Sequence, residues 1–104
     1  MAATASQIKR QIELIEEAMK TTGIWSEHAP EWVHQYDGGN IPNVWQWLQF
    51  VYLPMRYDGL PYSPMYLAPQ VRPYLDDTIT ENSLLVQRII ELDSLSSTIK
   101  AIPL

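Results

Sequence analysis

The segment from Val44 to Arg56 restricts what this chain can fold into more than any other stretch. It holds two of the four tryptophans and the single phenylalanine, and Arg56 is its one charged residue. A helix that is apolar on nearly every side packs in the interior of a fold. We therefore expect a buried central helix that begins at Pro42 or Asn43, residues that suit the first positions of a helix.

A proline interrupts this predicted helix. Pro54 has no backbone N–H to donate, and its ring crowds the carbonyl of Phe50, so the helix either kinks there or ends one residue earlier. We favour a kink, because Met55 continues the apolar line that begins at Val44.

Two amphipathic segments flank the central one. Between about Ser6 and Thr22 apolar residues recur at helical spacing, and Gly23 can end the helix in a left-handed conformation. The last helix is expected to begin near Thr78, which can form a capping box with Glu81. Its apolar stripe is wide enough to contact two neighbours.

Asp93 lies at the edge of that apolar stripe. A charged group that is partly buried needs a partner, and Arg56 is the partner we expect for it.

The connections between the helices are long and irregular. Turn-forming residues and prolines replace the helical period from Ile24 to Asn43, with a short helix expected around Glu31 to Tyr36. Prolines exclude a long helix between Tyr57 and Asp77, where Ser63-Pro64 and Ala68-Pro69 are typical of short helix starts.

No strand pattern competes with these helices, so the predicted class is all-α. At 104 residues the chain is long enough for one domain. We expect a compact, four-helix bundle-like single domain over residues 1–104, with a core from about 6 to 99 and loose termini.

Charge and composition exclude several functions. The formal net charge is −5 and the seven basic residues are scattered, which disfavours direct nucleic-acid binding. An acidic protein can nevertheless bind a basic enzyme that handles nucleic acid. There is no cysteine, and no apolar run reaches the roughly 18 residues of a membrane span. We expect a cytoplasmic protein with no membrane partner.

Four residues of the central segment share one line at helical spacing: Trp45, Gln49, Tyr52 and Arg56. An aromatic ring, an amide, a phenol and a guanidinium in one groove could bind a small ligand or a peptide. The plainer interpretation, which we favour, is that these side chains satisfy one another beneath the proline-rich segment.

The tyrosines suggest a different surface. Four tryptophans, six tyrosines and one phenylalanine exceed what a small helical core readily hides, and Tyr and Trp are favoured at protein interfaces. We predict an exposed aromatic patch formed by Tyr57, Tyr62 and Tyr66. The alternative is that these side chains anchor the core and the loops.

No catalytic set, metal site or cofactor motif is recognisable. His28, His34 and Asp37 match no established ligand spacing and lie in an irregular segment, so solvated loop positions are favoured. Glu13, Glu16 and Glu17 are most simply the solvated face of the first helix.

Taken together, several short runs resemble the YqcC-like family of small bacterial proteins over about Ile8 to Leu95. The runs are Gln35-Tyr36, Trp47 to Pro54, Leu60-Pro61, Ala68-Pro69 and Leu92-Asp93-x-Leu95. The resemblance implies a compact four-helix arrangement of uncharacterised biochemical role. Some members of the family are associated with a tRNA pseudouridine synthase, which implies an accessory role and not an enzymatic one.

Two classes of function therefore stay open. The first, which we prefer, is a non-catalytic accessory or interaction protein that docks onto a larger partner or self-associates. The second is a small-molecule binding protein or minor enzyme, with a pocket beside Trp45, Gln49 and Arg56.

Overall fold

The computed structural model describes residues 4–58 and 66–100, with side chains described as far as Leu95. Within these residues every regular element is helical and no strand is present, as the all-α prediction requires. The elements are α1 (Ala5–Thr22), α2 (Glu31–His34), α3 (Val44–Trp47), the π-helical turn η1 (Leu48–Tyr52), α4 (Leu53–Tyr57), α5 (Ala68–Val71), the 3₁₀ turn η2 (Arg72–Tyr74) and α6 (Leu84–Lys100).

The first helix has well-formed ends. The Thr4 hydroxyl accepts the backbone N–H of Gln7, and the Gln7 side chain accepts the backbone N–H of Thr4, which is a capping box. Gly23 ends α1 at a φ of 87°, a left-handed conformation that costs glycine little. The predicted helix from about Ser6 to Thr22 is confirmed.

The central helix is one continuous run from α3 through η1 to α4, which we call the central rod (residues 44–57). It begins where the sequence indicated, since the Asn43 side chain accepts the backbone N–H groups of Trp45 and Gln46. The π-helical turn ends at Tyr52, two residues before Pro54, which removes one N–H from the helical ladder. Helical structure continues past Pro54 as far as Tyr57.

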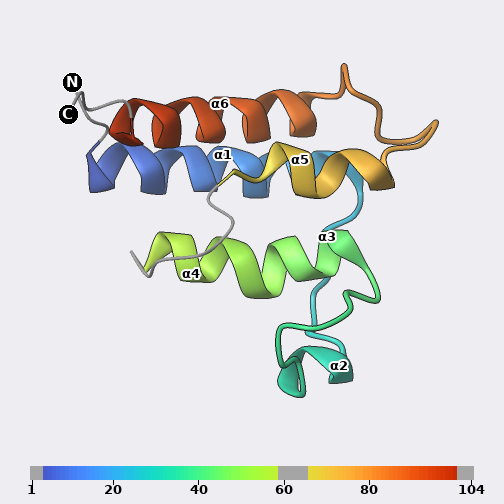
Figure 1. Ribbon diagram of the computed structural model, residues 1–104. Helices are drawn as coiled ribbons and strands as arrows, with labels where there is room; N and C mark the ends of the chain where they lie inside the picture. The colour runs from blue at the N-terminus through green and yellow to red at the C-terminus, as the bar shows by residue number, and fades with distance from the viewer. Residues whose placement is uncertain (1–3, 59–65, 101–104) are drawn as a thin grey trace.

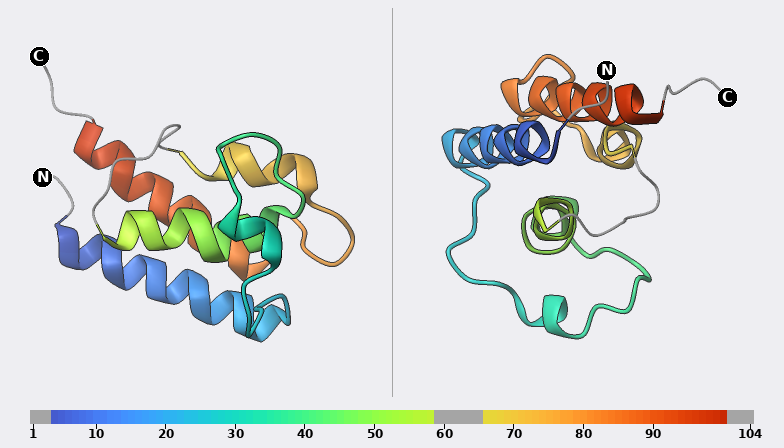
Figure 2. Two further views of the ribbon diagram at one scale, coloured as in Figure 1. Left: turned by 90° about the horizontal axis from the view of Figure 1, so that it is seen from below. Right: turned by 90° about the vertical axis from the view of Figure 1, so that its left-hand side faces the viewer.

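Three long helical segments pack in two layers (Figure 1). Helices α1 and α6 lie side by side and antiparallel, and the central rod runs beneath them, while α5 packs against α6. Seen end-on, the rod lies between this upper layer and α2 (Figure 2). The radius of gyration of 13.7 Å is close to the value of about 13 Å typical of a compact chain of this length.

The core lies where these layers meet. Each long segment contributes fully buried apolar side chains, among them Ile12, Ile15 and Met19 from α1, Trp47, Leu48 and Leu53 from the rod, and Leu85, Ile89 and Leu92 from α6. The central rod is therefore buried on several sides, as its composition predicted. Within the described ranges, no helix combines the length and the apolar character needed to cross a bilayer.

The last helix begins at Leu84, so the predicted start near Thr78 is wrong. One Asp76 carboxylate oxygen accepts the backbone N–H groups of Thr78 (2.8 Å) and Ile79 (3.0 Å), which folds these residues into a turn. The hydrogen bonds from Ile79 and Thr78 also hold the pKa of Asp76 below its usual value. Ile79 is buried and anchors the turn in the core.

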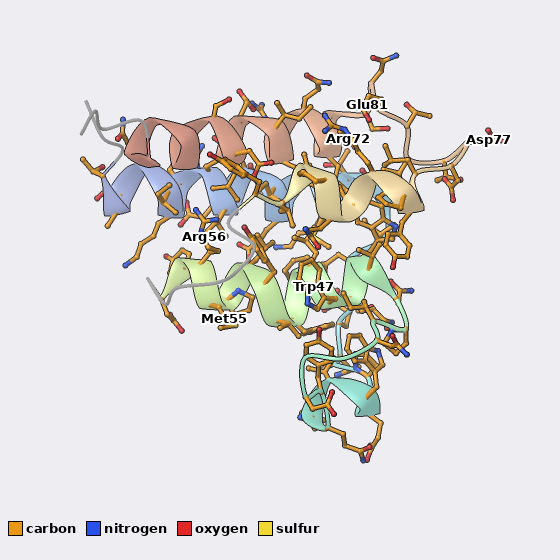
Figure 3. The ribbon with its side chains drawn as sticks, in the orientation of Figure 1. Trp47, Met55, Arg56, Arg72, Asp77 and Glu81 are labelled. Carbon is orange, nitrogen blue, oxygen red and sulfur yellow. The ribbon has the colours of Figure 1, made fainter. Side chains whose placement is uncertain are left out.

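Two side chains next to this region have partners that the sequence did not indicate. Glu81 does not cap α6; its carboxylate accepts a hydrogen bond from Arg72 Nε at 3.0 Å (Figure 3). Asp93 accepts the backbone N–H groups of Leu67 and Ala68 at 2.7 and 2.8 Å, so it holds the start of α5 on α6. Those two N–H groups occupy the carboxylate for which Arg56 was the expected partner.

Candidate functional site

The first half of the central rod uses its polar side chains to hold the chain's own loop. The Gln49 side chain is 6% exposed, and its amide both donates to the Ser26 carbonyl (2.8 Å) and accepts the Ser26 backbone N–H (2.9 Å). One turn earlier, Gln46 accepts a hydrogen bond from the Trp32 indole at 3.0 Å. These bonds attach the connection between α1 and α3 to the rod.

Of the four residues on the predicted groove line, Tyr52 is fully buried. The Arg56 guanidinium donates to the Tyr52 hydroxyl at 2.7 Å and lies 5.7 Å from the centre of its ring. Arg56 is on the side of the rod that faces α1 and α6, whereas Met55 is on the opposite side (Figure 3). Trp45 is partly buried against the core. The structure thus places Gln49 and Tyr52 in the interior and leaves Trp45 and Arg56 partly exposed.

The three residues of the predicted tyrosine patch differ in position. Tyr57, at the end of α4, is 37% exposed, and the Lys9 ammonium lies 5.2 Å from the centre of its ring. Tyr66 is half-buried and lines a shallow hollow between α5 and α6. Tyr62 lies outside the described residues.

A second hollow, which we call the α1–α4 hollow, lies between the middle of α1 and the end of the central rod. Its volume is about 290 Å³, and it opens to solvent. Apolar atoms of Leu53 and Pro54 line it together with the Tyr57 ring, and carboxylates line the rest; its lining residues are Glu13, Glu16, Leu53, Pro54, Tyr57 and Asp58.

The carboxylates of this hollow are not equivalent. Glu13 is paired with Arg10 at 3.4 Å, on the exposed surface of α1. Glu16 has no ion pair within 4 Å among the described residues, because the Lys20 ammonium one turn away lies over the Trp25 ring, 4.8 Å from its centre. Burial raises the pKa of the Glu16 carboxyl, while Lys20 lowers it and Glu13 raises it further.

This combination is suited to recognising a cation that has an apolar neighbour. Carboxylates attract the charge, the face of Tyr57 attracts it as well, and the exposed Pro54 offers apolar contact above the buried Leu53. Within the part of the chain that the structure describes, no three acidic or histidine side chains are arranged to hold a metal ion. His28 lies in a loop as expected, whereas His34 is an exposed residue at the end of α2. In the loop that follows α2, Asp37 accepts the backbone N–H of Gly39 at 2.9 Å.

The sequence did not indicate Glu13, Glu16 and Asp58 as site residues. Glu13 and Glu16 were interpreted as the solvated face of the first helix, and no spacing in the chain links them to residues 53–58. Tyr57 was the available signal, since a tyrosine that ends an otherwise buried helix lies at the edge of the core. Comparison of the chain with protein-family models, curated proteins and solved structures found no match in any of the three.

Proposed function

We propose that this protein is a non-catalytic accessory protein that docks onto a larger protein partner. One observation carries the proposal: Tyr57, a large aromatic side chain, is exposed on the rim of a hollow with an apolar floor. Exposed tyrosines beside a pocket are typical anchors of protein interfaces. Tyr62 and Tyr66 belong to the same proposed contact surface.

The nature of the partner follows from charge and from the resemblance. The net charge of −5 favours a basic partner, and the resemblance to the YqcC-like family points to an RNA-modifying enzyme such as a tRNA pseudouridine synthase. The protein would then act in the bacterial cytoplasm and reach RNA only through that enzyme. Self-association through the same surface is the other form of this proposal.

The hydrogen bonds of Gln49 favour docking over the small-molecule alternative. That alternative requires a pocket beside Trp45, Gln49 and Arg56, whereas the Gln49 amide is bonded through both its oxygen and its nitrogen to Ser26. A ligand would have to break both bonds before it could use this side chain.

The proposal includes two finer features of the fold. We take α1, the central rod, α5 with η2, and α6 as a four-helix arrangement, with the rod bent at Pro54. The π-helical turn next to Pro54 supports the bend, since such turns accompany kinks in helices.

Co-purification of the tagged chain from its native cells, followed by mass spectrometry, tests the proposal. We expect one stoichiometric protein partner with the wild-type chain, and much less of it with Tyr57→Leu. The matched control is Tyr74→Leu, because Tyr74 is also an exposed tyrosine, on η2 and outside the α1–α4 hollow. A clean monomer that carries a bound metabolite would overturn the proposal in favour of the small-molecule alternative.

A further inference from the structure

Two of the hollows beside the middle of α1 differ in charge. The outer one, between α1 and α6, contains charges of both signs from Glu17, Lys20 and Arg88 around Leu14 and Leu84. The charged residues that line the α1–α4 hollow are all carboxylates; Arg10 pairs with Glu13 and Lys9 lies over the Tyr57 ring, whereas Glu16 and Asp58 have no ion pair within 4 Å among the described residues. Charges of mixed sign favour no particular partner, whereas charges of one sign select an opposite charge.

The end of the central rod adds to this negative potential. Backbone carbonyls at a helix C-terminus carry a partial negative charge, and Asp58 lies at the end of α4. An acidic residue at that position is unfavourable unless a cation is nearby. Arg56, the basic residue of the last turn, donates to the Tyr52 hydroxyl instead of lining the hollow.

The Tyr57 ring already holds a cation of the chain itself. The Lys9 ammonium lies 5.2 Å from the centre of the ring, within the distance of about 6 Å at which a cation is attracted to an aromatic face. The ring therefore lies where a cation can contact its face, and a cationic group of a partner would take the place of Lys9 there.

The volume of the hollow limits what can fill it. About 290 Å³ lies just below the range of roughly 300–1,000 Å³ that is typical of ligand pockets. A hollow of this size, open to solvent and partly apolar, suits one long side chain of a docked protein better than a whole metabolite.

From these observations we propose that the α1–α4 hollow binds a basic segment of the partner protein, which inserts an arginine or lysine side chain next to an apolar residue. The cationic group contacts Glu16, Asp58 and the Tyr57 ring, and the apolar neighbour packs on Pro54, which is exposed beside the buried Leu53. This inference rests on the proposed function, and it names the chemistry of the partner's contact.

A peptide probe tests the inference with the full-length chain. The probe is a fluorescein-labelled peptide in which two arginines flank a leucine. Its matched control replaces each arginine by citrulline, which keeps the shape and the hydrogen-bonding group but removes the charge. Binding is measured by fluorescence anisotropy at low and at high ionic strength, because added salt screens contacts between exposed charges.

We expect the arginine peptide to bind at least about tenfold more tightly than the citrulline peptide, with a difference that shrinks in high salt. Glu16→Gln should weaken binding of the arginine peptide by about three- to tenfold, since it removes a partly buried charge from the hollow. Tyr57→Leu should weaken it by a similar factor, whereas Tyr57→Phe should keep most of the affinity because a phenyl ring also attracts cations.

Glu17→Gln is the matched control for Glu16→Gln. It changes the net charge by the same amount, one residue further along α1, but Glu17 lines the outer hollow. The inference is overturned if Glu17→Gln weakens binding as much as Glu16→Gln, or if the two peptides bind equally. Binding of agmatine, a small amine with a guanidinium group, is measured in the same assay. If agmatine binds as tightly as the arginine peptide, the hollow recognises a free cation and not a protein segment, and the inference is overturned.

The outcomes separate this inference from the proposed function. A protein partner that co-purifies equally well with the wild-type chain and with Glu16→Gln would refute the basic anchor but leave the accessory role intact. Recovery of a metabolite-bound monomer would refute the accessory role itself.

Discussion

The two halves of the central rod have similar composition but opposite relations to their surroundings. In the first half, Gln46 and Gln49 bond the chain's own loop, and Trp47 is buried. In the second half, Pro54 and Tyr57 line a hollow that opens to solvent. One helix thus organises the interior at one end and offers a contact surface at the other.

The difference shows that polar residues on a mostly apolar helix need not mark a binding site. The amide of Gln49 is buried, and its two hydrogen bonds to Ser26 offset the cost of removing it from water. Tyr57 contributes less to the interior, since more than a third of it remains exposed. Substitutions of the buried residues of the rod should therefore lower stability, and substitution of Tyr57 should change binding.

The largest expected effect is that of Trp47→Ala. Trp47 is 2% exposed and its ring centre lies 5.3 Å from that of Tyr52, so truncation leaves a cavity in the core and should cost about 3–5 kcal/mol in the free energy of unfolding. Trp45→Ala is the control. The Trp45 side chain is only partly buried, so its truncation should lower the free energy of unfolding by less. The free energy of unfolding of both variants is measured by urea denaturation. Equal losses in the two variants would contradict the assignment of Trp47 to the core.

Gln49→Leu should have the next largest effect. It removes both hydrogen bonds to Ser26 and leaves a partly buried N–H and C=O without a partner, at a cost of about 1–3 kcal/mol. Hydrogen exchange of the Ser26 amide should speed up in the variant. Gln46→Leu, which loses a single bond to Trp32, should cost about 0.5–1.5 kcal/mol. A larger loss of unfolding free energy in Gln46→Leu than in Gln49→Leu would contradict this ranking of the two side chains.

A pair of hydroxyl deletions compares a buried tyrosine of the rod with the exposed tyrosine at its end. Tyr52→Phe removes the acceptor of the Arg56 guanidinium and should cost about 1–2 kcal/mol, since hydrogen bonds to charged groups are stronger than neutral ones. Tyr57→Phe removes a hydroxyl from an exposed side chain and should stay within about 0.5 kcal/mol. Thermal unfolding of both variants checks this, and similar losses of stability would show that the hydroxyl of buried Tyr52 is worth no more than that of exposed Tyr57.

The smallest expected effect is the pH dependence that comes from Glu16. Burial raises its pKa in the folded chain, so the native state binds a proton more tightly than the unfolded state does. The stability contributed by the protonated form is present below the ordinary glutamate pKa and is lost as the pH rises through the raised one. Glu16→Gln should remove this loss and gain stability relative to wild type at neutral pH.

Glu17→Gln is the control for this titration, because Glu17 is exposed. Unfolding is followed by denaturant titration between mildly acidic and neutral pH. Identical pH profiles for wild type and Glu16→Gln would show that the carboxyl is not desolvated in the hollow.

Much of the fold could be predicted because the signals are local. Apolar spacing and Gly23 indicated α1, and the Asn43 side chain caps the rod where expected. The start of α6 was missed because Thr78 and Glu81 look like a capping box, while Asp76 captures the Thr78 and Ile79 N–H groups first. Ser63-Pro64, another predicted helix start, lies outside the described residues.

The candidate site was predictable only in part. Its aromatic anchor, Tyr57, was identified, but Glu13 and Glu16 were not, because they reach it from a helix some forty residues away in the chain. Asp93 shows the same limit, since its partners at the start of α5 depend on how α5 packs against α6.

The sequence by itself determined that this protein is helical, where its first helix begins and ends, and that the Val44–Arg56 segment is buried. Those features depend on side-chain periodicity and capping, which act within a few residues. Only the tertiary structure decided which polar groups of the rod are satisfied internally and which carboxylates surround Tyr57. Hydrogen bonds and salt-screened charges act between groups that are close in space, and these groups can be far apart in the sequence, so packing fixes their partners.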